Sequence, residues 1–91
     1  MENFLNKKSP TEISQLIAFN LKERRKKLKI SQEELAKKSG VSLGSIKRFE
    51  SKYEIALSSL IKIATALGVE SDFAELFAQK TYLSIDEVIN E

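Results

Sequence analysis

A cluster of cationic side chains lies in the middle of the sequence, among residues with hydroxyl and amide side chains. Its members are Lys37, Lys38, Lys47, Arg48 and Lys52. Lysine and arginine pair with phosphate, and they donate hydrogen bonds to guanine O6 and N7 in the major groove of DNA. These residue types point to nucleic acid as a partner, and the elements that carry them decide which ones reach it.

The charges of the chain are unevenly distributed. Residues 1–62 hold 14 Lys/Arg and 7 Asp/Glu, a net charge of +7, whereas residues 63–91 hold 1 and 6, a net charge of −5. A basic region attracts phosphate and an acidic region is repelled by it. We expect the basic part to face nucleic acid and the acidic end to face another partner. On charge alone, a merely solvated surface is the alternative.

The composition excludes most catalytic and metal sites. Cysteine and histidine are absent, so thiol and imidazole ligands, catalytic thiolates and disulfides are unavailable. The adjacent carboxylates Glu33 and Glu34 point to different faces of a helix, so they form no catalytic pair. No apolar run approaches the ~20 residues of a membrane span, and residues 1–20 lack the layout of a secretory signal. We expect no enzyme activity, no metal or cofactor, no membrane contact and a cytoplasmic location.

Capping signals predict where the first helix begins. Ser9, Pro10 and Glu12 combine an N-cap serine, a proline at the first helical position and a glutamate three residues after the cap. The helix therefore starts at Pro10. Apolar residues follow helical spacing along one of its faces: Ile13, Leu16, Ile17, Leu21 and Leu28.

Two short helices follow, joined by a tight turn. Ser31 and Glu34 form a second capping box, and Gly40 supplies the left-handed residue that ends this helix. Ser42 is the next N-cap, so a third helix runs from Leu43 to about Ser51. Helices joined by so short a turn must cross steeply.

Two further helices complete the pattern. An apolar stripe from Leu57 to Leu67 predicts a fourth helix that stops at Gly68, and Ser71 opens a shorter fifth helix. Ala56 stands where a capping residue would be expected, so the fourth helix should start loosely. We expect the aliphatic stripes and the aromatic residues of these helices to be core: Phe49, Phe73 and Phe77.

Residues 31–50, SQEELAKKSGVSLGSIKRFE, resemble the helix-turn-helix of the phage-repressor and Cro family, also called the XRE family. The resemblance extends from about Leu21 through Leu67. It implies an all-α, five-helix, lambda-repressor-like DNA-binding domain and a transcriptional regulator, most simply a repressor. With it the chain divides into an N-terminal arm (1–8), the helix-turn-helix domain (9–80) and an acidic C-terminal tail (81–91), whose structure the sequence leaves ambiguous.

The resemblance implies a role for particular side chains. The helix from Leu43 to Ser51 would enter the major groove with its N-terminal residues at base edges. The residues expected to contact DNA are Gln32, Ser42, Leu43, Gly44, Ser45, Lys47, Arg48 and Lys52. Gln32 would grip a phosphate, helped by Lys37 or Lys52, while Lys47 and Arg48 would reach either guanine or phosphate. Arg25 and Glu50 stand where the family places a structural ion pair.

Two residues of the expected reading helix depart from many relatives. Leu43 and Gly44 occupy positions where polar base-reading side chains are common, so specificity would depend on few hydrogen bonds and on DNA shape. Leu43 could touch a thymine methyl group. A glycine inside a helix weakens it unless something approaches the backbone closely, and here either DNA or Phe49 could do so.

Partners other than DNA are suggested as well. One short helix reads only a few base pairs, so we expect a homodimer on two half-sites, with an interface near Phe73, Leu76, Phe77 and Leu83. The residues VSLGSIKRFES and those after them also resemble HipB-type regulators, which implies an antitoxin or autorepressor that binds a HipA-type kinase through the acidic segment after Glu70. A protein-interaction module that has lost DNA binding is the remaining alternative.

Overall fold

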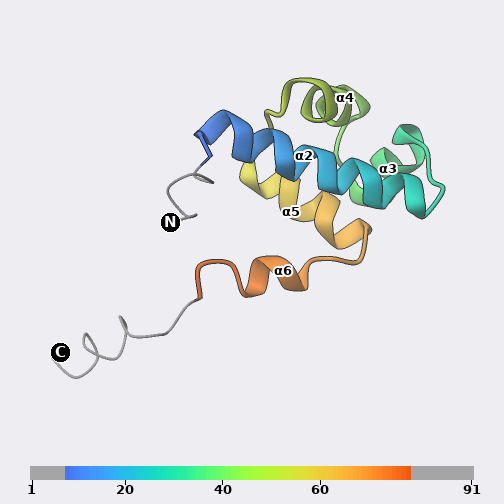
Figure 1. Cartoon of the computed structure of the whole chain (residues 1–91). Coiled ribbons are helices and arrows are strands. Elements are labelled where there is room, and N and C mark those ends of the chain that lie inside the picture. The colour runs from blue at the N-terminus through green and yellow to red at the C-terminus, as the bar shows by residue number, and fades with distance from the viewer. Residues whose placement is uncertain (1–7, 79–91) are drawn as a thin grey trace, which may run out of the picture.

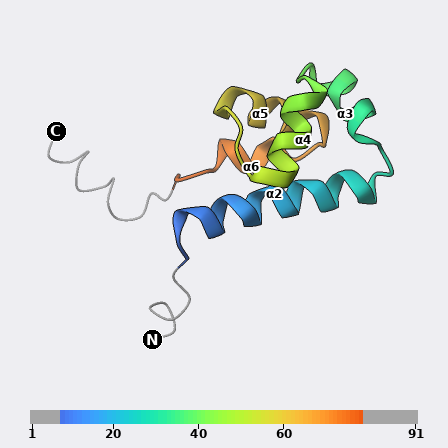
Figure 2. The ribbon, with the colours of Figure 1, turned by 90° about the horizontal axis from the view of Figure 1, so that it is seen from above.

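The computed structural model describes residues 8–78, which form five helices and no strand. They are α2 (Pro10–Lys27), α3 (Gln32–Ser39), α4 (Leu43–Lys52), α5 (Leu57–Ala66) and α6 (Ser71–Ala74). The long helix α2 crosses the domain, with α4 on one side of it and α6 on the other (Figure 1). Seen from above, α3 and α4 meet at one end of the molecule (Figure 2). The predicted tail, 81–91, and most of the predicted arm lie outside the described residues.

The predicted capping boxes of α2 and α3 are both present. The Ser9 hydroxyl accepts a hydrogen bond from the Glu12 backbone N–H at 3.1 Å, and the Glu12 carboxylate accepts one from the Ser9 N–H at 2.8 Å. Ser31 and Glu34 repeat this arrangement at the start of α3, with distances of 3.0 and 2.7 Å. Each box satisfies two backbone donors that a helix start leaves unpaired. Both helices therefore begin where their sequences predict.

The turn between α3 and α4 also follows the sequence. Gly40 ends α3 with φ at +79°, the left-handed conformation that suits a residue without a Cβ atom. Ser42 caps α4, and its hydroxyl accepts from the Ser45 N–H at 3.1 Å. α4 ends at Lys52, one residue later than predicted, where Tyr53 adopts a positive φ of 65°.

The core lies where α3, α4 and α5 meet under α2. Leu35, Ile46 and Ile63 are each at most 1% exposed, and Ala18, Val41, Phe49 and Leu67 complete the same buried cluster. Leu35 and Ile46 pack in this cluster beneath the crossing of α3 and α4. Each of the three helices therefore contributes apolar side chains that fix the turn and the reading helix in place.

The prediction that all the apolar stripes are core is wrong at several places, among them Leu57 at the start of α5, which is 64% exposed. On α2, Ile13, Leu16 and Ile17 are 39–47% exposed, and Ala18 is the one fully buried residue of this helix. The rest of the described chain therefore covers the apolar face of the first half of α2 only in part.

The predicted fifth helix is also shorter than its apolar pattern. α6 ends at Ala74, Phe77 has a positive φ of 61°, and its side chain is 89% exposed. Phe77 is therefore not part of the core. Phe77 lies beyond the end of this four-residue helix, at one end of the groove that Phe73 also lines.

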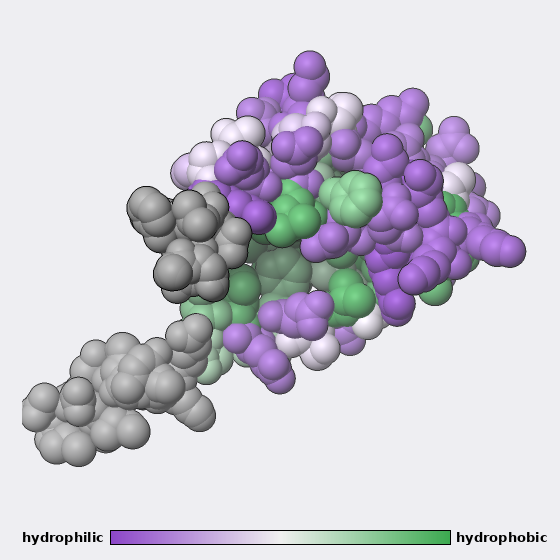
Figure 3. Space-filling view, in the orientation of Figure 1, coloured by the Kyte–Doolittle hydropathy of each residue, from purple (hydrophilic) through white to green (hydrophobic). Residues whose placement is uncertain are grey.

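The exposed apolar residues border a groove of about 410 Å³ between α2, α5 and α6. Its apolar lining comes mainly from Ile17, Leu21, Leu57, Leu60, Phe73 and Leu76, with Phe77 at one end. Figure 3 shows this hydrophobic hollow between the body of the domain and α6, surrounded by hydrophilic residues. None of the described helices is both long enough and apolar enough to cross a membrane.

Candidate nucleic-acid interface

α4 has one buried face and one exposed face. Ile46 and Phe49 are 0% and 3% exposed and hold the helix against the core. On its other side, Lys47 and Arg48 are exposed, as are Ser42 and Gly44. Leu43 and Ser45 are half-buried between the two faces. The expected contact residues of this helix therefore share a surface that the core does not cover.

The first turn of α4 is ordered by its own hydroxyl groups. The Ser42 Oγ accepts from the Ser45 backbone and also lies 2.9 Å from the Ser45 Oγ, to which it donates. Ser42 therefore holds the helix start in shape as well as standing at the exposed face. Ser45 keeps its own hydroxyl hydrogen for a further acceptor.

Gly44 stands in open space. A Cβ atom added at this position would meet no atom of the chain within 4 Å. The suggestion that Gly44 makes room for Phe49 is therefore wrong. A helical glycine costs about 1 kcal/mol relative to alanine, and close packing within the described chain does not account for it here.

Arg48 forms an ion pair that the sequence analysis missed. Its Nη2 atom lies 2.6 Å from the Glu54 Oε1 atom, and both side chains are 64% exposed. Glu54 follows the left-handed Tyr53, which turns the chain back toward α4. The sequence does show an acidic residue just past the end of α4. Its contact with Arg48, however, depends on the left-handed turn at Tyr53.

The expected ion pair between Arg25 and Glu50 is formed. The Arg25 Nε and Nη2 atoms donate to the two Glu50 oxygens at 2.8 and 3.0 Å, and Nη1 donates to the Ile30 carbonyl at 2.8 Å. The two side chains are 11% and 6% exposed. This bidentate ion pair connects α2 to the end of α4 and so restrains the orientation of α4 relative to α2.

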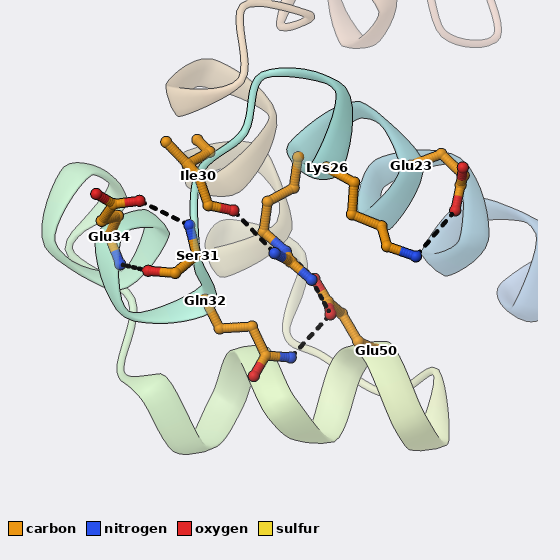
Figure 4. Close-up of polar contacts among 8 residues, drawn as sticks. Glu23, Lys26, Ile30, Ser31, Gln32, Glu34 and Glu50 are labelled. Carbon is orange, nitrogen blue, oxygen red and sulfur yellow. Dashed lines mark hydrogen bonds and ion pairs between the residues drawn. The ribbon is translucent and has the colours of Figure 1, made fainter.

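Gln32 joins the same network, which the sequence did not predict. Its side-chain amide donates to the Glu50 Oε1 atom at 2.8 Å, so the first residue of α3 is fixed to the end of α4 (Figure 4). An amide carries two N–H donors, and this contact uses one of them. Gln32 therefore connects the two helices and keeps one N–H donor that this contact does not use.

These contacts determine the ionisation of Glu50. Burial raises the pKa of its carboxyl group, but the hydrogen bonds from Arg25 and Gln32 and the charges of Arg25 and Lys22 outweigh burial. The pKa of Glu50 therefore lies below its ordinary value. The carboxylate stays charged at neutral pH, as its role as a triple acceptor requires.

Some cationic side chains of this region form contacts within the domain, whereas others form no ion pair with a described residue. Arg24 on α2 donates from Nε to the Leu67 carbonyl at 3.0 Å and so satisfies a carbonyl group at the end of α5. Lys37, Lys38, Lys47 and Lys52 are exposed and form no ion pair with another described residue. These lysines therefore remain available for phosphate.

The comparisons with known proteins agree with this geometry. A family model described as "Helix-turn-helix" matches residues 21–73, which is more than half of the chain and includes α3 and α4. The comparisons with curated proteins and with solved structures gave no match. The all-helical fold, the two capped helices around Gly40 and the family match together show that the chain belongs to the XRE family of helix-turn-helix DNA-binding transcriptional regulators, of the Cro/cI type.

Proposed function

We propose that this regulator is a sequence-specific repressor that inserts α4 into the major groove of its operator. The observation that carries the proposal is the exposed face of α4, where Lys47 and Arg48 stand beside the open backbone at Gly44. A helix can approach base edges only if its outward face is free and its other face is anchored. α4 meets both conditions, because Ile46 and Phe49 fix it to the core.

The contacts divide into two kinds. Gln32, Lys37 and Lys52 would bind phosphates and set the register of the helix, without reading sequence. Ser45 would donate to a base edge, and the half-buried Leu43 would contact a thymine methyl group. Lys47 and Arg48 would donate to guanine or to phosphate. Gly44 would allow the backbone of α4 to lie closer to the DNA than any side chain permits.

The test is binding of the purified protein to fragments of its own promoter at several salt concentrations. Lys47→Ala and Arg48→Ala should each weaken specific binding, by about 1–3 kcal/mol for a residue that contacts a base. Lys62→Ala on α5 is a matched control, because it removes an exposed cation outside α3 and α4. If both variants bound like the control, or if the protein showed no preference over random DNA at low salt, the operator proposal would fail.

We propose further that the protein binds its operator as a homodimer whose subunits meet at the apolar groove. Two half-sites about one DNA turn apart require two reading helices, which only a second copy supplies. In Figure 1 α6 lies across α2 from α4, so a subunit on the groove leaves the exposed face of α4 uncovered. Leu76 and Phe77, at 46% and 89% exposed, are the apolar area that such a contact would bury.

Sedimentation of two phenylalanine variants tests the dimer. Phe77→Glu places a charge in the groove, whereas Phe19→Glu changes a residue that is 56% exposed on α2 but does not line the groove. Both substitutions should leave the folded monomer intact, because neither side chain is buried. We expect Phe77→Glu alone to dissociate the dimer, and equal behaviour of the two variants would place the interface elsewhere.

A second candidate function is that of a HipB-like antitoxin or autorepressor that also contacts a HipA-type kinase. The acidic side chains in and beside α6 support it, because Glu70, Asp72 and Glu75 are all exposed. The helix α6 itself lies across α2 from α4 (Figure 1). Such a partner could bind together with DNA. Co-purification with a HipA-type kinase, lost on replacing these three residues by their amides, would support this function; retention of the kinase by that variant would argue against this surface.

A further inference from the structure

An acidic side chain borders the exposed face of α4. Glu54 accepts from the Arg48 Nη2 atom at 2.6 Å, and the two residues share a shallow hollow of about 320 Å³. Its lining residues are Ser45, Arg48, Glu54, Ile55, Ala56 and Ser59. Ser45 comes from the first turns of the reading helix. Glu54 therefore lies beside the surface that would meet DNA.

Folding does not explain this pair. Both side chains are 64% exposed, and ion pairs in water at such exposure contribute little to stability. A carboxylate beside a phosphate-binding surface opposes binding, since affinity for DNA of any sequence grows with the number of phosphates that cations neutralise. The pair therefore opposes the proposed DNA binding and, at this exposure, contributes little to the stability of the described domain.

The geometry leaves Arg48 able to read a base. A guanidinium group has five N–H donors in a planar fork, and the contact with Glu54 uses only the Nη2 end. The other donors can still reach O6 and N7 of a guanine. Pairing with Glu54 thus lowers the attraction of Arg48 for phosphate while preserving its ability to donate to a base.

We propose that Glu54 is a specificity-determining residue that acts through Arg48. It neutralises Arg48 on DNA of arbitrary sequence, and it orients the same side chain where the operator offers a guanine. Its effect is to weaken binding to random DNA more than binding to the operator. This inference rests on the proposed insertion of α4 into the major groove.

The test compares Glu54→Gln with Glu23→Gln, using a random duplex and a promoter fragment at several salt concentrations. Glu23 is the matched control, because it is a half-exposed carboxylate on α2 whose partner Lys26 lies 3.7 Å away. Glu54→Gln should tighten binding to random DNA by about two- to five-fold, the range of exposed charge pairs. The slope of log affinity against log salt should become steeper by about one unit for random DNA and change less for the promoter.

Arg48→Ala distinguishes this mechanism from simple removal of a negative charge. Glu54→Gln should have a clearly smaller effect on random DNA when Arg48 is already alanine, because only the direct repulsion between the carboxylate and phosphate then remains. An undiminished effect in that background, equal changes on both DNAs, or equal behaviour of Glu54→Gln and Glu23→Gln would overturn the inference alone. If Lys47→Ala and Arg48→Ala both left DNA binding unchanged, the insertion of α4 would fail, and this inference with it.

Discussion

The helix-turn-helix unit and the groove beside α6 differ in how completely their apolar side chains are buried and in how their helices are capped. In the unit, Leu35 and Ile46 are at most 1% exposed, both helices have serine caps, and the outward surface is polar. At the groove, Leu57 and Phe77 are 64% and 89% exposed, and neither α5 nor α6 has a side-chain cap. The first region is complete within one chain. The second leaves apolar area that a partner can bury.

Substitutions in the core should show the largest difference in unfolding free energy between the two regions. Ile46→Ala leaves a cavity in the closest-packed part of the domain and should lower the free energy of unfolding by about 2–5 kcal/mol. Phe77→Ala, although it removes a larger side chain, should change the unfolding of the monomer by less than about 0.5 kcal/mol. Urea titrations at a protein concentration that keeps the chain monomeric would measure both. Similar losses in the two variants would mean that the groove is part of the folding core.

The two glycines of the reading unit should respond in opposite directions. Neither position has an atom within 4 Å of a built Cβ, so backbone conformation alone decides. Gly40→Ala puts a side chain at a φ of +79° and should cost about 1–2 kcal/mol. Gly44→Ala lies within a helix and should stabilise the protein by up to about 1 kcal/mol while weakening operator binding. Thermal melts and DNA titrations would reveal both signs, and undiminished operator binding by Gly44→Ala would remove close approach as its reason.

A smaller effect, confined to acid, should come from Glu50. Because its folded-state pKa is lowered, its contribution to stability is fully present above the ordinary value of 4.5 and is lost as the pH falls through the lower folded-state pKa. Glu50→Gln cannot titrate, so its stability should fall less steeply across that window. Urea melts at a series of acidic pH values would test this. Parallel curves for the variant and the natural protein would exclude Glu50 as a source of the acid sensitivity.

The smallest effect should come from repairing a cap. The Ala56 side chain makes no hydrogen bond at the start of α5, unlike the serines that cap α2, α3 and α4. Ala56→Ser should raise the free energy of unfolding by about 0.5–1 kcal/mol, because a serine can accept from the first turn of the helix. Ser42→Ala should lower it by a similar amount. A thermal melt in which Ala56→Ser had no effect would show that α5 starts in a strained or already satisfied geometry.

The sequence predicted interactions between residues close together in the chain better than interactions between distant residues. The starts of α2, α3 and α4 were predicted correctly, since a capping box joins residues three positions apart and can be read directly. The shared cluster of Arg25, Glu50 and Gln32 was predicted only in part: the ion pair came from a family resemblance, and the Gln32 contact was not foreseen. The pairing of Arg48 with Glu54 was missed, because it depends on the positive φ of Tyr53. Tyrosine rarely adopts a positive φ, so this turn could not be predicted from the sequence.

Short-range sequence patterns specify the local structure of this protein: where its helices start, the left-handed turn at Gly40 and the helix-turn-helix pattern of its family. Which apolar residues are covered depends on the tertiary fold. Ile17 and Leu35 both occupy apolar helical positions, yet Leu35 is buried and Ile17 is 39% exposed. Spacing along a helix fixes which side chains share a face, but whether another helix covers that face depends on where distant segments of the chain lie.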